Sequence, residues 1–367
     1  MQTTFIRPGT YNTVTQAAIA PGNDVMVYGR YRERGYHVEP LTSRAGGVFT
    51  PENASASEAF ALAGLNWTAE KRDALYSPDG ITIKRATDHC SIIRSDTGDL
   101  LGIHGAGYTP LQHTAIINLL DYLREDIRIE SVLNIRQGRK VVVSAALKLL
   151  QDEVVPGDRI RRYIHIFNSH DGSSAFGVMF SDRRLRCANE LHFITGRAFH
   201  NAVAEGNGLR ARHTVNVEQF ARSLPDLINL QQQSFHQRIW EMQDMAATPC
   251  TIEMALRILE QTYADRLATP VHERNGTTRE RRLGDIRDFD TIMSHYQGET
   301  GYGINDDARP IGGTVYGLYN AITQFHTHDA GHKTDTTEHA RARLESLWGG
   351  PSAARVEKAY QACLAAC

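Results

Sequence analysis

Positive charge is concentrated in the middle of the sequence. Between residues 131 and 213 there are thirteen Lys and Arg against seven Asp and Glu, a net charge of +6 in a chain whose net charge is −2. Guanidinium groups contact phosphates and aromatic rings stack on bases of any identity, so this asymmetry predicts a nucleic-acid interface on a near-neutral protein. The predicted contacts are Arg136, Arg139, Lys140, Arg161, Arg162, Tyr163, Phe167, Arg183, Arg184, Arg186, Arg210 and Arg212.

The aromatic residues of this region follow the period of a strand. Tyr163, His165 and Phe167 fall on one strand face, because strand side chains alternate, and Tyr163 and Phe167 are therefore the stacking candidates. A plainer interpretation stays open. Arginines at strand ends often form a solvated surface, and aromatic residues on strands often belong to the core.

The segment Asn168-Ser169-His170-Asp171-Gly172-Ser173 is rich in small polar residues. It is typical of a tight hairpin loop in which Asn and Asp cap their own backbone. The alternative places His170 and Asp171 at a ligand or a subunit contact. No nucleophile elbow surrounds Ser173, so no catalytic triad and no other catalytic residue is predicted.

Three histidines near the C-terminus, His326, His328 and His332, have the short spacing that metal ligands often show. Ala330-Gly331 interrupts helical continuity between them and no HExxH motif is present, so a polar helix end is the favoured interpretation and a metal site the alternative. The glycines around residue 105 lack the Lys-Ser/Thr of a phosphate loop. No cofactor is predicted, and an enzyme is the less favoured reading.

The composition is that of a globular protein, with 41% hydrophobic and 22% charged residues. No apolar run is long enough to span a membrane, and no signal-peptide pattern is seen, so a cytoplasmic protein without a membrane partner is expected. The five cysteines are odd in number and widely spaced, which favours reduced thiols over a disulfide framework.

Alternating residues predict strands up to about residue 215, and 3.6-residue periodicity predicts helices after it. This order indicates an α+β fold: a twisted antiparallel sheet of β-hairpins with helices packed on one face and an all-helical C-terminal part. A helix is also expected at about 187–204. The expected divisions are an N-terminal arm or extension at 1–53, a hairpin-rich core domain at 54–215, and a helical region at 216–367 with a mobile loop at about 270–313.

Several short stretches occur in one order along the chain. They are Ala63-Gly64-Leu65-Asn66-Trp67, Arg94-Ser95-Asp96-Thr97-Gly98, Gly107-Tyr108-Thr109-Pro110-Leu111-Gln112, Asn168 to Ser173, Arg184-Leu185-Arg186-Cys187-Ala188-Asn189, Arg212-His213-Thr214 and Gly313 to Thr323. Together they resemble the phage/plasmid-like protein family, domain-of-unknown-function family 932, over roughly residues 57–350. The resemblance implies a bacterial host cell and a mobile element rather than a reaction.

Three functions stay open. The first is non-enzymatic binding of single-stranded DNA in phage or plasmid recombination, by a homo-oligomer that anneals strands, because a basic hairpin pair before a helix resembles the layout of phage single-strand annealing proteins. The second is an interaction or anti-defence protein that binds a host protein, with the predicted helix at 217–246 as an oligomer seam. The third is a metal-dependent hydrolase that uses the C-terminal histidines.

Overall fold

The computed structural model describes most of the chain. The described residues are 26–29, 32–33, 36–37, 47–50, 54–173, 175–184, 190–193, 208–211, 217–274, 276–297, 311–331, 339, 342–343, 346–347 and 350–367. In the N-terminal strands and in the strands at 190–193 and 208–211, only the backbone is described.

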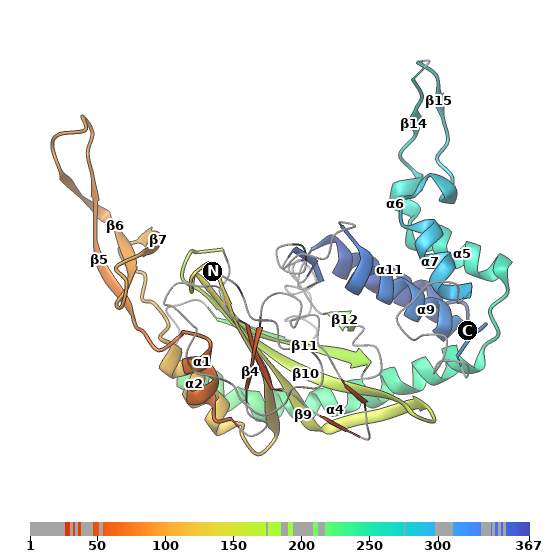
Figure 1. Cartoon of the computed structure of the whole chain (residues 1–367), viewed down its shortest axis with the longest axis horizontal. Helices are drawn as coiled ribbons and strands as arrows, with labels where there is room; N and C mark the ends of the chain where they lie inside the picture. Colours follow the sequence, from red (N-terminus) through yellow and green to blue (C-terminus); the bar gives the residue numbers. More distant parts are fainter. Residues whose placement is uncertain are drawn as a thin grey trace.

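An eight-stranded sheet forms the centre of the molecule, in the order β12-β11-β10-β9-β8-β1-β4, with β13 also paired to β11 (Figure 1). Its core is an antiparallel meander of β8 (Ile127–Ile135), β9 (Lys140–Val155), β10 (Asp158–Ser169) and β11 (Phe176–Arg184). Val and Ile recur along these strands, as expected for strands covered by packing. The predicted α+β fold with an antiparallel sheet is confirmed.

Both edges of this sheet differ from the sequence expectation. At one edge, β1 (Met26–Gly29) pairs antiparallel with β8 and parallel with β4 (Gly47–Thr50), so part of the expected N-terminal arm joins the main sheet. A small hairpin of β2 (Arg32–Glu33) and β3 (Tyr36–His37) lies between them in sequence. At the other edge, β12 (Glu190–Phe193) and β13 (Gly208–Ala211) pair with β11; β12 lies where the sequence predicts a helix.

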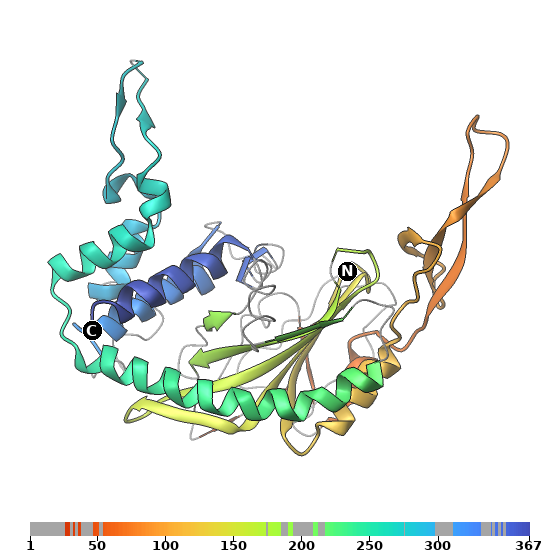
Figure 2. The ribbon, with the colours of Figure 1, turned by 180° about the vertical axis from the view of Figure 1, so that it is seen from behind.

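Helices cover one face of the meander. The 31-residue helix α4 (Val217–Ala247) runs along the sheet from the region of α1 and α2 to the C-terminal helices, as both views show (Figures 1 and 2). Its Phe235 and Ile239 belong to the same core as Ile164 of β10. Helices α1 (Ala56–Leu62) and α2 (His113–Tyr122) pack together at the end of the sheet.

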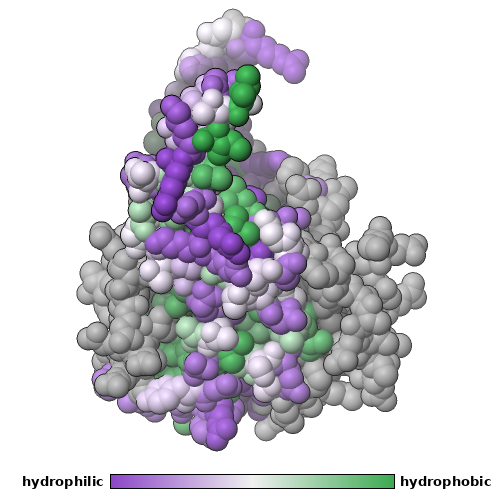
Figure 3. All heavy atoms as spheres, turned by 90° about the vertical axis from the view of Figure 1, so that its left-hand side faces the viewer, coloured by the Kyte–Doolittle hydropathy of each residue, from purple (hydrophilic) through white to green (hydrophobic). Residues whose placement is uncertain are grey.

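A three-stranded sheet of β5 (Ala69–Tyr76), β6 (Lys84–Arg94) and β7 (Leu100–Gly105) projects from this end of the molecule. We call residues 69–105 the β5–β7 arm. Figure 3 views the molecule from the side of this arm and shows hydrophobic and hydrophilic side chains gathered in separate stripes along it.

The C-terminal region is mainly helical. Its elements are α5 (Ile252–Thr262), α6 (Ala264–Leu267), β14 (Val271–His272), β15 (Thr278–Arg279), η3 (Leu283–Asp285), α7 (Phe289–Gln297), α9 (Val315–Gln324), the π-helix η4 (Phe325–Asp329) and α11 (Pro351–Leu364). The hairpin β14–β15 and the helix α7 lie where a loop is predicted from the sequence. This hairpin rises on the same side of the sheet as the β5–β7 arm, at the opposite end of the molecule.

Candidate nucleic-acid interface

A four-residue turn at 136–139 joins β8 to β9 and carries part of the predicted interface. Arg136 and Arg139 are exposed, and Lys140, the first residue of β9, is half-buried. We call Arg136 to Lys140 the basic turn. Arg136, Gln137 and Gly138 have φ angles of +52°, +61° and +88°. Left-handed backbone costs a non-glycine residue roughly 1–2 kcal/mol, so the surrounding structure must impose this conformation.

The basic turn lies on a buried aromatic platform. A Cβ atom at Gly138 would lie 2.2 Å from a ring carbon of Trp67, so the backbone contacts the indole directly. The guanidinium of Arg94 lies 4.5 Å from the centre of the Trp67 ring and donates to the carbonyl oxygen of Gln137 at 2.8 Å. Asp96 holds Arg94 through two hydrogen bonds of 3.0 and 2.7 Å. The exposed side chains of Arg136 and Arg139 therefore extend from a backbone that Trp67 and Arg94 hold in place.

Residues 168–173 lie beside the basic turn; 168 and 169 end β10, and 170–173 begin its connection to β11. The backbone N–H of His170 donates to the carbonyl oxygen of Arg139 at 2.7 Å. The carbonyl oxygen of His170 lies 2.8 Å from Nε2 of His104. The His170 ring is buried, 5.8 Å from the ring of Trp67. Asp171 accepts from the backbone N–H of Ser173 at 2.9 Å. Asp171 thus caps its own backbone as the hairpin interpretation expects, whereas Asn168 lies in β10 and donates to the carbonyl oxygen of Leu111 at 3.5 Å. A ligand role for His170 and Asp171 stays a prediction.

Burial raises the pKa of the Asp171 carboxyl, but hydrogen bonds from Ser173 and the charge of Lys140 outweigh it, and the pKa is lowered overall. Asp171 is thus ionised near the basic turn at neutral pH. Its charge partly offsets that of Lys140, which leaves the two exposed arginines as the stronger cations of this surface.

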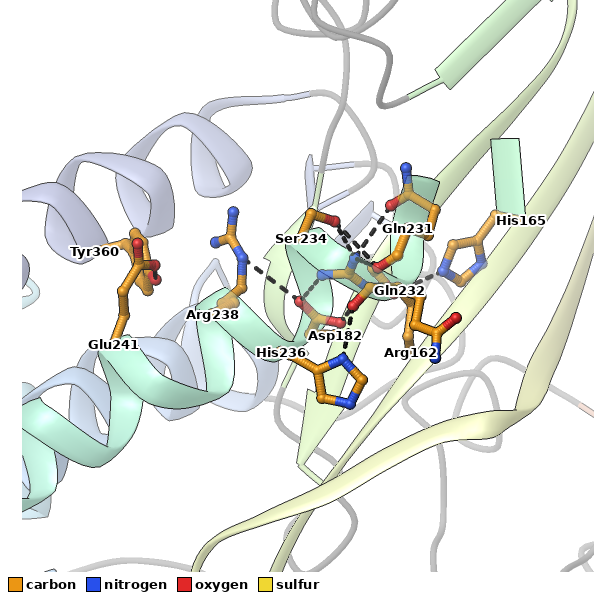
Figure 4. Close-up of polar contacts among 11 residues, drawn as sticks. Arg162, His165, Asp182, Gln231, Gln232, Ser234, His236, Arg238, Glu241 and Tyr360 are labelled. Atoms are coloured by element: carbon orange, nitrogen blue, oxygen red, sulfur yellow. Dashed lines mark hydrogen bonds and ion pairs between the residues drawn. The ribbon is translucent and has the colours of Figure 1, made fainter. Parts of the chain in front are cut away.

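Two predicted contacts, Arg162 and Arg184, lie on the sheet face that α4 covers. Arg162 binds Asp182 with two hydrogen bonds of 2.7 Å and also donates to the carbonyl oxygen of Gln231 at 2.9 Å and to Ser234 at 2.6 Å (Figure 4). Arg184 pairs with Asp158 at 2.5 Å. These contacts bind the strands to each other and to the helix.

Three other predicted contacts share the opposite sheet face. The guanidinium of Arg183 lies 4.3 Å from the centre of the Tyr163 ring. Arg161 and Arg183 both pair with the carboxylate of Glu130, at 3.8 and 3.6 Å. Next to them, the ring nitrogens of His165 hydrogen-bond Ser144 and Ser181, at 2.8 and 2.7 Å. Burial, with Arg183 nearby, lowers the pKa of His165 to about 3, so this ring is neutral.

The arginines of β10 and β11 therefore do not form the solvent-facing row that the sequence suggests. Arg161, Arg162, Arg183 and Arg184 are 2, 4, 3 and 1% exposed. Neighbours along a strand point to opposite faces, and both faces are covered here, so each cation is paired with an acid inside the protein. Truncating any of them would leave a buried acid without its partner and is therefore expected to destabilise the fold.

The remaining predicted contacts lie in different places. Phe167 is half-buried, on the same strand face as Ser169, which pairs in register with Lys140. Arg210 of β13 lies opposite Gly177, the partner of Phe167 on β11. Arg186 and Arg212 lie outside the described residues. The structure thus brings the basic turn, Phe167 and the register position of Arg210 to one end of the sheet.

The three histidines of the predicted C-terminal cluster also differ in their surroundings. His326 is buried, with Nε2 at 3.4 Å from the Tyr263 hydroxyl, and burial lowers its pKa to about 3. His328 is half-buried, and His332 lies outside the described residues. Among the residues that the structure describes, no group of three or more His, Cys, Asp or Glu is arranged to hold a metal ion.

Sequence reasoning missed the platform under the basic turn. Trp67 and Arg94 each belong to one of the family-like stretches, but neither stretch shows by its spacing that it meets the turn at residue 138. It also missed His295, whose Nε2 lies 2.7 Å from Asp329 across 34 positions. The sequence shows these residues and their motifs, but it does not show that Trp67 and Arg94 contact the basic turn or that His295 contacts Asp329.

The fold and this site define an α+β protein that presents a fixed cationic turn at one end of an antiparallel sheet. A family model described as a domain of unknown function, DUF932, matches residues 100–348, and the chain belongs to this family. No curated protein and no solved structure matches the chain. No helix among the described residues is long and apolar enough to cross a membrane.

Proposed function

We propose that the protein binds single-stranded nucleic acid without catalysing a reaction, as a homo-oligomer acting in phage or plasmid recombination. The observation that carries this proposal is the basic turn, in which exposed Arg136 and Arg139 extend from a backbone fixed on Trp67 and Arg94. Because the backbone of the turn is already fixed, only the side chains of the two arginines lose conformational freedom when they bind phosphates. Such a turn suits the repeating charge of a nucleic-acid backbone.

The neighbouring aromatic residue favours a single strand over a duplex. Phe167 is half-buried on the strand face that leads to Lys140, and its ring can offer a stacking surface to an unpaired base. Bases inside a duplex are already stacked and do not present their faces. A surface that combines phosphate contacts with a partly exposed ring would therefore favour single strands.

The arrangement of the elements gives further support. The β8–β11 meander carries the basic turn, and α4 follows it and runs across one of its faces. A basic hairpin pair followed by a helix is the feature in which the sequence resembles single-strand annealing proteins. Fold analogy alone does not establish function, so the proposal depends on the exposed cations.

Fluorescence anisotropy of a labelled single-stranded oligonucleotide at two salt concentrations tests the proposal, with a duplex of the same sequence alongside. We expect tighter binding of the single strand and affinity that falls steeply with salt, because bound cations are released from the phosphates. The variant Arg136→Gln/Arg139→Gln/Lys140→Gln should bind at least about 10-fold more weakly, and its log–log salt dependence should be shallower by about 2.

The matched control is Arg124→Gln/Arg257→Gln/Arg274→Gln, which removes the same charge from exposed residues of other elements. We expect it to bind almost as the unchanged chain does. If both triple variants lost the same affinity, binding would depend on the net charge of the protein and not on the position of the basic turn. Absence of binding at low salt would overturn the proposal and favour the alternative in which the protein binds a host protein.

A further inference from the structure

The β5–β7 arm exposes more apolar surface than any other described part of the chain. Of the ten large hydrophobic residues that are exposed in the described chain, six lie on this arm. They are Leu75 (63% exposed), Tyr76 (52%), Ile81 (88%), Ile83 (72%), Leu100 (44%) and Ile103 (60%). At roughly 100 Å² each they amount to about 600 Å², the upper end of the apolar patches found on monomers.

Five of these six residues form one surface, while Leu75 lies next to Tyr76 on β5 and therefore points to the other face. The register places Tyr76, Leu100 and Ile103 on the same face of the arm. Ile103 and Leu100 of β7 lie opposite Ser91 and Ile93 of β6, which share one face. Ser91 also pairs with Arg72 of β5, and Tyr76, four residues after Arg72, points to the same side. Ile81 and Ile83 extend this surface to the tip. The hydrophobic stripe in Figure 3 follows the arm along its length.

A projecting strand pair is poorly suited to stand alone in water. Isolated two-stranded hairpins are marginally stable, and the outer half of the arm consists only of β5 and β6, since β7 pairs with residues 89–93 of β6. β5 is moreover an outer strand of the arm, with one backbone edge directed away from β6. Both features are those of a segment that is completed by another polypeptide.

The charges of the arm indicate what kind of partner fits. Residues 69–105 contain five Lys and Arg and six Asp and Glu, a net charge of −1. Several of these charges pair within the arm, as in Arg85 with Asp73 at 2.9 Å. Such a surface offers no net electrostatic attraction to a nucleic acid or an anionic membrane, whereas a near-neutral protein surface that is itself apolar matches it.

We propose that the β5–β7 arm docks on the β5–β7 arm of a second copy of this chain, in a two-fold symmetric contact. The five residues other than Leu75 give about 500 Å² of apolar surface from each copy, which with the polar atoms around it reaches the approximately 800 Å² per partner of a standard stable interface. A two-fold contact needs only one self-complementary patch, and it is the commonest way in which soluble proteins associate. The contact needs no nucleic acid, and its residues lie outside the basic turn, which touches the arm where Arg139 donates to the carbonyl oxygen of Leu100 at 3.1 Å.

Multi-angle light scattering after size exclusion, between about 1 and 100 μM chain and without nucleic acid, tests this. The unchanged chain, of 40.9 kDa, is expected to elute at the mass of two copies. Ile81→Asp/Ile83→Asp should weaken the association at least about 100-fold, because each isoleucine leaves an apolar contact. Both residues are exposed in the single chain, so the variant should fold with an unchanged circular dichroism spectrum.

A second variant keeps the test independent of added charge. Tyr76 and Lys84 are partners in register, so Asn-Gly can replace residues 77–83 as a two-residue hairpin turn. It should also be monomeric. The control Leu149→Asp/Ile252→Asp places the same charges at exposed apolar residues outside the arm and should stay dimeric. A monomeric unchanged chain, or arm variants that associate as the unchanged chain does, would overturn the proposal.

Measurement of oligonucleotide binding by the same variants separates the two proposals. If the arm proposal is wrong but the function is right, affinity depends on the basic turn and the arm variants associate as the unchanged chain does. If the function is wrong but the arm proposal is right, the chain is a dimer that the arm variants dissociate, and the oligonucleotide is not bound.

Discussion

Arg162 and Asp182 face each other across β10 and β11 and form a two-pronged ion pair inside the protein. Arg162 continues to α4, where Gln231 and Ser234 accept its remaining hydrogen bonds. Arg238, on the same helix, approaches Asp182 at 3.6 Å. The pair thus joins two strands and a helix at a single buried point.

The first prediction concerns this pair. Arg162→Ala should lower the free energy of unfolding by about 3–5 kcal/mol, because it leaves Asp182 charged and buried without its main partner. Urea denaturation of the unchanged chain and the variant measures the difference.

The double variant Arg162→Met/Asp182→Leu is the control. Replacing both charges by apolar side chains of similar size should cost much less than removing one of them. If the single and the double variant were equally unstable, the loss would come from packing rather than from the unpaired charge.

The second prediction concerns Gly138, on which the basic turn depends. Gly138→Ala should be markedly destabilising, because its new methyl group would collide with the Trp67 ring. Gly157→Ala has almost the same φ, +82° against +88°, but nothing lies within 4 Å of its added atom, so it should cost only about 1 kcal/mol. Thermal melts of both variants compare the two, and equal shifts would remove the contact with Trp67 as the cause.

The third prediction concerns His113 of α2, which is packed edge-on against Trp67 at 4.4 Å between ring centres. Neither ring nitrogen has a hydrogen-bond partner among the described residues, and a buried polar atom without a partner costs about 1–3 kcal/mol. His113→Phe should therefore leave stability at pH 7 unchanged or raise it by about 1 kcal/mol. A clear fall in the urea midpoint would show that the imidazole makes a needed contact.

The fourth prediction is acid sensitivity. Burial lowers the pKa values of His113, His165 and His326 from about 6.5 to about 3. Between these values the unfolded chain binds protons that the folded chain does not, so stability is full above pH 6.5 and falls as the pH drops toward 3. Each histidine contributes at most about 1.4 kcal/mol per pH unit.

Urea midpoints at several pH values between 7.5 and 4.5 measure this slope. In His113→Phe the slope should be shallower, because one of the three protonations is missing. A midpoint that stays constant over this range would show that the three rings reach solvent or a counter-charge as they titrate.

The hairpins within the meander can be predicted from the sequence, because short turns that contain Gly separate segments rich in Val and Ile. That β9 and β10 also pair, which joins the hairpins into one meander, is shown by the structure. It does not predict that Met26–Gly29 joins β8, since a four-residue strand far from its partner has no local signal. The hairpin β14–β15 has the Asn275-Gly276 turn signal, but its two-residue strands are too short to show alternation.

The site is harder to predict than the fold. Arg161 and Arg162 are adjacent and look equivalent, and only the strand period combined with covered faces assigns one to Glu130 and the other to Asp182. Charge counts cannot distinguish a cation that faces solvent from one that meets a carboxylate twenty positions away. Arg136 and Arg139 stay exposed because a turn, unlike a strand in a covered sheet, has no packing layer above it.

The ion pairs of Asp182 also bear on how the chain can be divided. Arg238 lies 4.6 Å from the ring centre of Tyr360, on α11, so one aspartate of the sheet is linked through a single arginine to the last helix. A fragment that ended before α4 would keep Asp182 and Arg162 and would lose Arg238, which approaches Asp182, together with Gln231 and Ser234, which accept from Arg162. The sheet and the C-terminal helices are therefore expected to melt in one cooperative transition, and neither half is a unit that could be exchanged by recombination without the other.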